Sequence, residues 1–240
     1  MTFIAVNNWQ WVDYDILNST NDEAKKLINA SSRIVVTAKK QTAGRGRFGH
    51  TWIGLEGNLF MSLGFGWDAK NTNILSLISS LAVLNSVKKY APNLDIMLKW
   101  PNDVLVNNCK ISGILLEIVA PSKVVVGIGI NISAAPNLED NTAYKAACLK
   151  EHGIIVERAE FMRTFLQKFD EITGIYQKSG AQKIIDMWLG CAHKIGKEIT
   201  VRSGKTQICG EFMGLDKHGL LLLKTSDKDI KTISAGDIYF

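Results

Sequence analysis

The stretch Gln41–Trp52 reads QTAGRGRFGHTW, and it interleaves three glycines with two arginines. Glycine has no Cβ, so it adopts positive φ and lets the backbone approach a ligand closely. The arginine guanidinium is a planar fork of donors that matches the oxygens of a phosphate or a carboxylate. A loop of this composition favours an anionic ligand that is enclosed and later released. A solvated basic surface loop explains the same residues, so the rest of the chain must decide.

Length and composition are those of an ordinary globular protein. The chain has 240 residues, of which 46% are hydrophobic and 21% charged, enough for a large domain and a small one. The excess of Lys+Arg (28) over Asp+Glu (23) gives a net charge of +5, which suits an anionic ligand and is weak support for nucleic acid. The four cysteines are far apart and typical of free thiols. Because neither a signal peptide nor a membrane-length apolar run is visible, we expect a cytoplasmic protein without a membrane partner.

Apolar periodicity predicts an α+β fold in two domains. The expected strands of the first domain, residues 1–190, are 9–17, 33–38, 58–65, 96–100, 104–106, 110–119 and 123–131. The expected helices are 20–28, 74–90, 142–152, 157–179 and 181–189. Because several strands are joined by short turns, we expect a mixed, largely antiparallel sheet with packed helices. Five short strands separated by turn signals predict a small β-barrel over residues 191–240.

The junction between the first strand and the first helix offers two hydroxyl groups. Thr20 and Glu23 have the spacing of a capping box, so Thr20 is the expected N-cap of the helix. Capping explains Thr20 well and Ser19 less well, so the junction also predicts a ligand contact.

A second constellation starts at Lys99–Asp103, KWPND, and continues on the following hairpin. Asn102 and Asp103 offer oxygens for a magnesium ion that bridges phosphates. Lys110 offers a point charge, and Gly113 allows close backbone approach. Each part also has a simpler explanation. Asn102 and Asp103 can form an ordinary turn after Pro101, and Lys110 can be an exposed lysine on a strand.

Other known sites fit the glycines poorly. A dinucleotide site needs strand, glycines and then helix, whereas another strand follows the glycines here. The sequence contains no HRD or DFG of a protein kinase and no GxxxxGK[ST] phosphate loop. It also lacks HExxH or a Cys/His cluster that would bind a transition metal.

Five motifs occur in one order along the chain. They are Ser19-Thr20-Asn21, Gln41-Thr42-x-Gly44-Arg45-Gly46-Arg47, Lys99-Trp100-Pro101-Asn102-Asp103, Lys110-x-x-Gly113-Ile114-Leu115 and Gly127-Ile128-Gly129-Ile130-Asn131. Together they resemble the biotin–protein ligase (biotin–[acetyl-CoA carboxylase] ligase) family, over essentially the whole chain. The combination of GRGR and KWPND is far more specific than either piece. The resemblance implies a class II synthetase-like catalytic domain and an SH3-like C-terminal barrel.

The resemblance also implies the reaction and the residues that perform it. Relatives activate biotin with magnesium ATP to biotinyl-5′-AMP, then transfer biotin to one lysine of a biotin carboxyl carrier domain. By resemblance, Ser19, Thr20, Gln41 and the backbone near Gly113 hold the ureido ring, and Gly44, Arg45 and Arg47 form the loop over the adenylate. Lys110 lies between the biotin carboxylate and the α-phosphate, Asn102, Asp103 and Asn131 serve ATP and magnesium, and residues 133–144 cover the adenine. The expected catalytic residues are Lys110, Arg45, Arg47 and Asp103, and Asp103 orients or deprotonates the acceptor amine.

Elementary chemistry agrees with this interpretation. Adenylation joins two anions, so positive charge is needed where the carboxylate meets the phosphate. Lys110, the two loop arginines and magnesium supply that charge. An acyl-adenylate must be kept from water, which explains a loop that closes over it.

Two departures from the family and several alternatives stay open at this point. Phe48 stands where many relatives have a second basic residue, which bears on how tightly the closed loop holds its intermediate. Too few residues precede Ser19 for a helix-turn-helix, so a repressor role and a nucleic-acid partner are disfavoured. A lipoate or octanoate ligase shares the general fold, but the hydroxyl and amide groups favour a ureido ring. A non-enzymatic ligand-binding regulator is a further alternative, and the resemblance allows a monomer or a homodimer.

Overall fold

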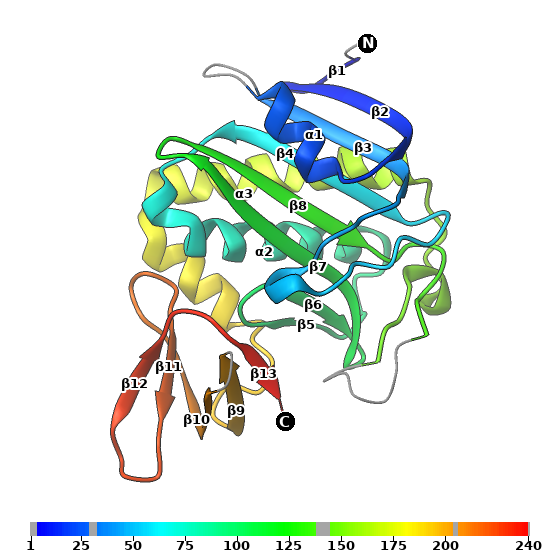
Figure 1. The fold of residues 1–240 in the computed structure, drawn as a ribbon. Coiled ribbons are helices and arrows are strands. Elements are labelled where there is room, and N and C mark those ends of the chain that lie inside the picture. The colour runs from blue at the N-terminus through cyan, green and yellow to red at the C-terminus, as the bar shows by residue number, and fades with distance from the viewer. Residues whose placement is uncertain (1–3, 29–32, 138–144, 204–205, 240) are drawn as a thin grey trace.

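The computed structural model describes residues 4–28, 33–137, 145–203 and 206–239. They form a large sheet with helices on both faces and a second, C-terminal sheet (Figure 1). The expected class, a mixed sheet with packed helices followed by a small all-β part, is confirmed. Closure of the C-terminal strands into a barrel and a domain boundary after residue 190 stay predictions.

The large sheet has eight strands in the order β1-β2-β3-β4-β8-β7-β6-β5. Their bounds are β1 Ile4–Val6, β2 Trp9–Leu17, β3 Ile34–Gln41, β4 Leu59–Gly66, β5 Ile96–Lys99, β6 Asp103–Val106, β7 Cys109–Ala120 and β8 Lys123–Ile130. Strands β2 and β3 run parallel, and the other pairs of described strands in this sheet are antiparallel. The predicted mixed, largely antiparallel sheet is therefore confirmed, and only the three-residue β1 was not predicted.

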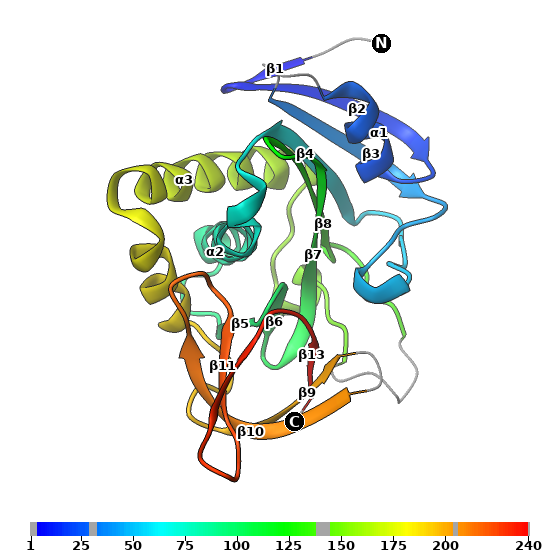
Figure 2. The same cartoon turned by 60° about the vertical axis from the view of Figure 1, so that its left-hand side comes forward.

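Each face of this sheet carries a buried core, and alternate side chains of a strand point to opposite faces. Val35 belongs to the main core under α2 (Thr72–Tyr90) and α3 (Arg158–Leu189), whereas Val36 belongs to a smaller core under α1 (Thr20–Leu27). Figure 2 shows the sheet nearly edge-on, with α2 and α3 on one side and α1 on the other.

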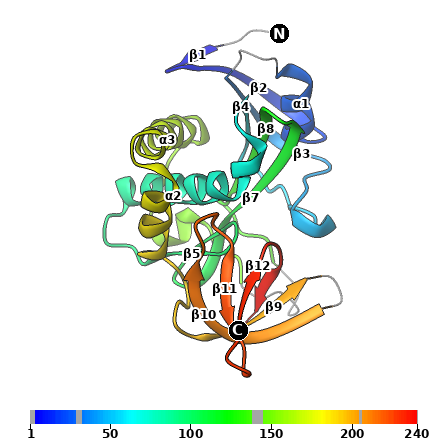
Figure 3. The ribbon, with the colours of Figure 1, turned by 90° about the vertical axis from the view of Figure 1, so that its left-hand side faces the viewer.

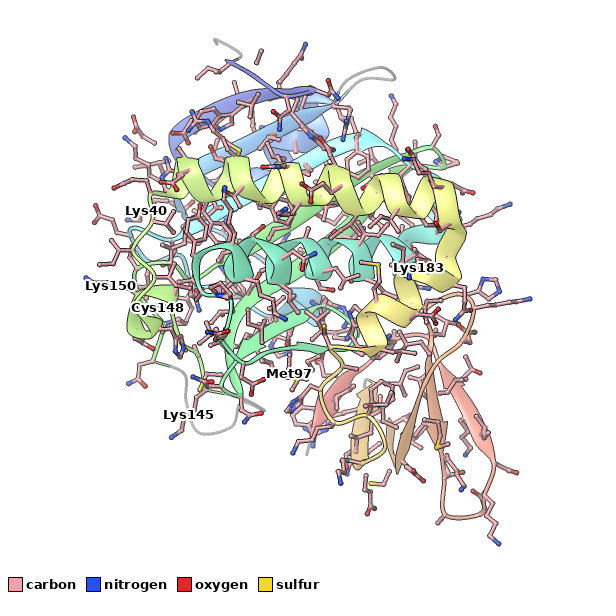
Figure 4. The ribbon with its side chains drawn as sticks, turned by 180° about the vertical axis from the view of Figure 1, so that it is seen from behind. Lys40, Met97, Lys145, Cys148, Lys150 and Lys183 are labelled. Atoms are coloured by element: carbon pink, nitrogen blue, oxygen red, sulfur yellow. The ribbon has the colours of Figure 1, made fainter. Side chains whose placement is uncertain are left out.

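The helices follow the apolar pattern of the sequence. Helix α2 is buried along most of its length, because it lies between the sheet and α3 (Figure 2). The two helices predicted over 157–179 and 181–189 are joined into α3, which bends at Gly180 with φ +76°. Figure 4 shows this bend from behind, close to the labelled Lys183. Glycine tolerates this backbone conformation without the strain that a Cβ would cause.

The C-terminal sheet has five antiparallel strands in the order β12-β11-β10-β9-β13. Their bounds are β9 Glu198–Ser203, β10 Thr206–Leu215, β11 Leu221–Lys224, β12 Ile230–Ile233 and β13 Asp237–Tyr239. This sheet lies below the large one and beside its β5 end (Figure 3). The Trp100 indole donates a hydrogen bond of 3.1 Å to the carbonyl of Gly219, so the two parts are in direct contact.

The helix predicted over residues 142–152 is wrong. Residues 138–144 lie outside the described part of the chain, and only Leu149–His152 form a short 3-10 turn, η3. The stretch before it is extended instead, because the amide of Lys110 donates to the carbonyl of Lys145 at 2.8 Å, and Ala147 donates back to Lys110 at 3.0 Å. The expected C-cap, Gly153, is present with φ +78°.

The four cysteines are free thiols, as expected. Cys148, labelled in Figure 4, is buried, and burial raises the pKa of its thiol. Among the helices of the described ranges, none has the length and apolar character needed to span a membrane.

Candidate active site

A cavity of about 290 Å³ opens between α1, β7, β8 and the glycine loop, residues 44–52. The loop lies on the same side of the sheet as α1, opposite α2 and α3 (Figure 2). The predicted site residues that line this cavity are Ser19, Thr20, Gln41, Arg45, Arg47, Asn102, Asp103, Lys110, Gly113 and Asn131. Gly44 instead closes the base of the loop, where its carbonyl accepts a hydrogen bond of 3.0 Å from the amide of Trp52. The loop arginines and Lys110 therefore share one cavity.

The first turn of α1 forms one wall of the cavity. The N-cap is Ser19 and not the predicted Thr20, because the Ser19 hydroxyl accepts a hydrogen bond of 3.4 Å from the amide of Asp22. Thr20 is the first helical residue, and its hydroxyl and amide both donate to the side-chain oxygen of Gln41, at 3.1 Å and 2.8 Å. Ser62 donates to the Thr20 hydroxyl at 2.8 Å. These polar groups are thus held in fixed positions at one end of the cavity.

Glycines on β7 and β8 form the floor of the cavity. A Cβ on Gly127 would meet the Asn21 side chain inside 3.0 Å, and a Cβ on Gly129 would meet the Trp52 ring inside the same limit. Gly113 on the neighbouring strand also faces Trp52. The alternating glycines of β8 point to one face, so the missing side chains make room for α1 and for the loop.

The Trp52 ring lies on this glycine floor and carries an unused donor. Its indole Nε1 is buried and has no hydrogen-bond partner among the residues that the structure describes. The Lys110 ammonium lies 5.6 Å from the ring centroid. Because buried donors are nearly always paired, this N–H marks a place where a bound ligand can accept a hydrogen bond.

The two arginines of the glycine loop face different partners. Arg45 forms a bidentate pair with Asp22, with N–O distances of 2.6 Å and 2.7 Å. Arg47 donates to the Asn102 side-chain oxygen and to the Gly236 carbonyl, each at 3.3 Å, and lies 3.9 Å from Asp237. Burial lowers the pKa of Arg47, although Asp237 and Asp103 oppose this shift, and an arginine remains charged.

A cluster of charges lies at the end of the β5–β6 turn. The Lys110 ammonium is 2.6 Å from an oxygen of Asp103 in an ion pair. The ammonium of Lys99, 7% exposed, is 3.8 Å from the other oxygen of the same carboxylate. Burial lowers the pKa of Lys99, and Asp103 opposes the shift. The Asn102 amide is fixed by a 2.7 Å hydrogen bond to the carbonyl of Ile114.

Asn131 and Asn58 fix the chain that leaves β8. The Asn131 amide donates to the carbonyl of Ala147 at 3.1 Å, and its oxygen accepts from Asn58 at 3.3 Å. The Asn58 oxygen accepts three backbone amides of residues 132–134, at 3.0 to 3.2 Å. The predicted adenine-covering segment, residues 133–144, is described only up to residue 137, and the remainder lies outside the described residues.

The expected magnesium ligands, Asn102 and Asp103, do not fit a resident metal site. The oxygen of Asn102 accepts a hydrogen bond from Arg47, and Asp103 lies against two lysine ammonium groups. In the described ranges there is no group of three or more His, Cys, Asp or Glu that could hold a metal ion. Magnesium usually takes several ligands from water and substrate phosphates, and these side chains alone do not supply its coordination shell.

Comparisons with known proteins agree with this geometry. The model described as biotin/lipoate A/B protein ligase family matches residues 14–133, and the model of the biotin protein ligase C terminal domain matches residues 194–240. The chain is 35% identical over 236 residues to "Bifunctional ligase/repressor BirA" of Bacillus subtilis, covering 94% of this chain and 72% of the relative. The chain belongs to the biotin protein ligase family.

Two further relatives match this chain over almost the whole length of both proteins. The chain is 32% identical over 234 residues to the biotin--[acetyl-CoA-carboxylase] ligase of Paracoccus denitrificans, covering 93% of this chain and 97% of the relative. The structure of biotin protein ligase from Aquifex aeolicus in complex with biotin and ATP has a TM-score of 0.80 and 28% identity, and the match covers 97% of each chain. Biotin protein ligases therefore match this chain from the large sheet through the C-terminal sheet.

Within this biotin protein ligase fold, the cavity also holds residues to which the sequence analysis gave no role. Among them are Asn21, Trp52, Lys99, Asp237 and Tyr239. Trp52 belongs to the stretch 41–52 and Lys99 to the KWPND motif, so both lie next to residues that were predicted to form the site. Asp237 and Tyr239 come from β13, and nothing in their local sequence indicates that they reach the cavity.

Proposed function

We propose that this protein activates biotin with ATP to biotinyl-5′-AMP and then transfers the biotin to a lysine of a biotin carboxyl carrier domain. The observation that carries the proposal is a single cavity that joins Lys110, the loop arginines and the polar start of α1 in a chain of this family. Biotin has a carboxylate at one end and a ureido ring at the other, so it needs a cationic region and a polar region.

The first step joins the two anions. A carboxylate oxygen of biotin attacks the α-phosphorus of ATP, the bond from that phosphorus to the β-phosphate oxygen breaks, and pyrophosphate leaves. Lys110 and Arg47 lie on the cavity and offset the charge that builds up on the phosphoryl oxygens. Fixed cations are most effective once the glycine loop has closed over the substrates and excluded water. We assign magnesium to the MgATP substrate, where phosphate oxygens and water supply its ligands.

The other end of the cavity suits the ureido ring. The hydroxyl groups of Ser19 and Thr20, the amide of Gln41 and the backbone near Gly113 offer donors and acceptors on the cavity surface. The unpaired indole N–H of Trp52 adds a donor beside the glycine floor. An octanoyl or lipoyl chain has no ureido group to satisfy these polar groups, so biotin is the better match.

The second step needs a neutral acceptor amine. The lysine nitrogen of the carrier domain attacks the carbonyl carbon of biotinyl-5′-AMP, the bond from that carbon to the phosphate oxygen breaks, and AMP leaves. The amine loses a proton as the amide forms. Asp103, on the cavity and beside Lys110, is our candidate for the group that orients this amine or accepts its proton.

Asp103→Asn should slow the transfer of biotin from preformed biotinyl-5′-AMP by about tenfold, because it loses one charge-assisted hydrogen bond to the amine. Supplying the adenylate separates this step from adenylation. Asp227→Asn, a matched change in an exposed turn of the C-terminal sheet, should have no effect. Transfer by Asp103→Asn at the rate of the unaltered protein would exclude this role.

Arg47→Gly should raise the release of biotinyl-5′-AMP by about tenfold, because the loop loses a charged contact with the intermediate. Released adenylate reacts with any exposed amine, so bystander proteins should become labelled. The measurement is the amount of biotin attached to serum albumin when albumin and the carrier domain are present in the same reaction. Lys228→Gly is the control, since it removes one charge at a residue with φ +68° outside the cavity lining. Labelling confined to the carrier would refute the prediction.

The function itself is tested by intact-protein mass spectrometry. A carrier domain incubated with this protein, biotin and MgATP should gain one biotin on one lysine. Biotin-dependent exchange of pyrophosphate into ATP should accompany it, and this exchange excludes a non-enzymatic ligand-binding regulator. Lipoate and octanoate, offered in competition, test the alternative acyl groups. Absence of both exchange and carrier labelling would reject the proposal.

Three earlier expectations about partners and place stay predictions. A homodimer is compatible with the large sheet, because β1 and β5 are its edge strands and an edge can pair with a second chain. The absence of a nucleic-acid partner and the cytoplasmic location are also proposals. We also propose that the chain divides into two domains between residues 190 and 191, because the mixed sheet lies before this point and the all-antiparallel sheet after it.

A further inference from the structure

The glycine loop is attached to α1 by a bidentate ion pair. The two terminal nitrogens of Arg45 lie 2.6 Å and 2.7 Å from the two carboxylate oxygens of Asp22. Two parallel N–H···O bonds fix the plane of the guanidinium as well as its distance. Hydrogen bonding to Arg45 is the largest cause that lowers the pKa of Asp22 to about 2, so this carboxylate is charged at neutral pH.

A second layer of charges surrounds this ion pair. Glu117 on β7 lies 3.6 Å from Arg45, and Lys25 lies 2.6 Å from Glu117 and 3.4 Å from Asp22. Asn21 donates to the other oxygen of Glu117 at 2.6 Å. The four charged groups alternate in sign and belong to the loop, to α1 and to β7. The loop is therefore tied to two rigid elements that also line the cavity.

Arg47 has a different environment, two residues further along the same loop. Its two hydrogen bonds, of 3.3 Å, go to neutral oxygens of Asn102 and Gly236, and the carboxylate of Asp237 is 3.9 Å away. A phosphate can replace neutral acceptors at little cost. Displacing Asp22 from Arg45 would instead break a bidentate ion pair and leave Asp22 and Glu117 to share Lys25, which is unfavourable.

We propose that Asp22 latches the glycine loop through Arg45, so that Arg45 is a positioning residue and Arg47 is the arginine that meets the phosphate of the intermediate. Asp22 itself touches no reacting atom and acts through Arg45. For the adenylate this inference rests on the function proposed above.

The latch controls opening of the loop more than stability of the fold. Asp22 and Arg45 are about 40% exposed, and ion pairs at such sites add little to global stability. The other polar contacts of residues 45–50 with the rest of the described chain are longer: Arg47 donates two hydrogen bonds of 3.3 Å, and Arg47 and His50 lie 3.9 Å from Asp237. The bidentate pair is therefore a large part of what holds this segment closed. The closed fraction sets how fast an enclosed intermediate escapes.

The first experiment measures release of biotinyl-5′-AMP from the full-length protein without acceptor. Asp22→Asn and Arg45→Ala should each raise the release rate by about tenfold, with an unchanged thermal midpoint. Asp22→Glu keeps the carboxylate that pairs with Arg45 and should retain most of the slow release. The matched control is Glu23→Gln, because Glu23 lies in the same helical turn but pairs with Lys26 and Tyr14.

A second readout needs no ligand and no activity. Trypsin cleaves after arginine, and the glycine loop offers Arg45 and Arg47. Asp22→Asn keeps both sites and should raise the rate of loop cleavage in the ligand-free protein by about tenfold, whereas Glu23→Gln should not. If the unaltered protein forms no adenylate while this cleavage difference is present, the proposed function fails and the latch stands.

Two results would overturn the latch. One is an Arg45→Ala variant that releases the adenylate fast while Asp22→Asn releases it at the normal rate, because Arg45 would then act on the ligand directly. The other is an Asp22→Asn variant with unaltered release and unaltered cleavage by trypsin.

Discussion

Lys110→Gln should lower the rate of biotinyl-5′-AMP formation by about 10²–10³-fold, the usual cost of removing one fixed group that stabilises transition-state charge. The Lys110 ammonium lines the cavity, and it is held 2.6 Å from Asp103. Glutamine is close in length and removes the charge. The carboxylate of biotin and the α-phosphate of ATP would then meet with less compensation, whereas contacts to the ureido ring stay in place.

Single-turnover formation of the adenylate measures this effect, and equilibrium binding of biotin is measured alongside it. The binding constant for biotin should change much less than the rate, because the charge matters most as the two anions come together. Lys123→Gln at the start of β8, outside the cavity lining, is the matched control. Lys110→Arg keeps the charge and should retain part of the rate. A glutamine variant that adenylates biotin at the normal rate would remove Lys110 from the mechanism.

The fold was largely predictable where the signal is local. The turn between β6 and β7 is Asn107-Asn108, both residues have positive φ, and asparagine is favoured in this conformation. Strand β2 has the predicted bounds, Trp9–Leu17, because alternating apolar residues end at a polar junction. Gly153 ends the η3 turn as predicted, but the helix before it does not form, because backbone hydrogen bonds with Lys110 hold that chain extended.

The N-cap of α1 shows where local reasoning fails. Ser19 and Thr20 are adjacent, both have acidic residues three positions later, and either can cap a helix by spacing alone. Gln41 at the end of β3 decides between them, because its side-chain oxygen accepts a hydrogen bond from the Thr20 hydroxyl. A sequence pattern within one helix contains no information about that partner.

The candidate site was predictable as a set of motifs but not as a set of contacts. The family resemblance grouped the loop arginines with Lys110, and the structure places them on one cavity. The resemblance did not indicate that the carboxylate of Asp22 forms a bidentate ion pair with the Arg45 guanidinium. It also gave no indication of Asp237, which the C-terminal sheet brings to within 3.9 Å of Arg47. Such pairings follow from packing between distant segments, which periodicity and local motifs do not encode.

Gly127→Ala should lower kcat/KM for biotin by about 100-fold, because displacement of a positioning group by about 1 Å is amplified in catalysis. A Cβ at Gly127 would meet the Asn21 side chain inside 3.0 Å, closer than real Cβ atoms come. Asn21 is buried and accepts from the Ser62 hydroxyl at 2.5 Å while donating to Glu117 at 2.6 Å. It cannot move without breaking these bonds, and Thr20 shares the same Ser62 partner.

The same change should lower the free energy of unfolding by about 1–3 kcal/mol, the cost of leaving a buried polar group without its partner. Gly66→Ala is the matched control, because it lies at the exposed end of β4 and its Cβ would have its nearest neighbour, the Ser122 carbonyl, at 3.7 Å. Urea unfolding should show that variant within about 0.5 kcal/mol of the unaltered protein. A Gly127→Ala variant with normal kcat/KM and normal stability would mean that Asn21 has room to retreat. Gly127 would then be dispensable to the cavity floor, and the close contact with Asn21 would not be what fixes the polar start of α1.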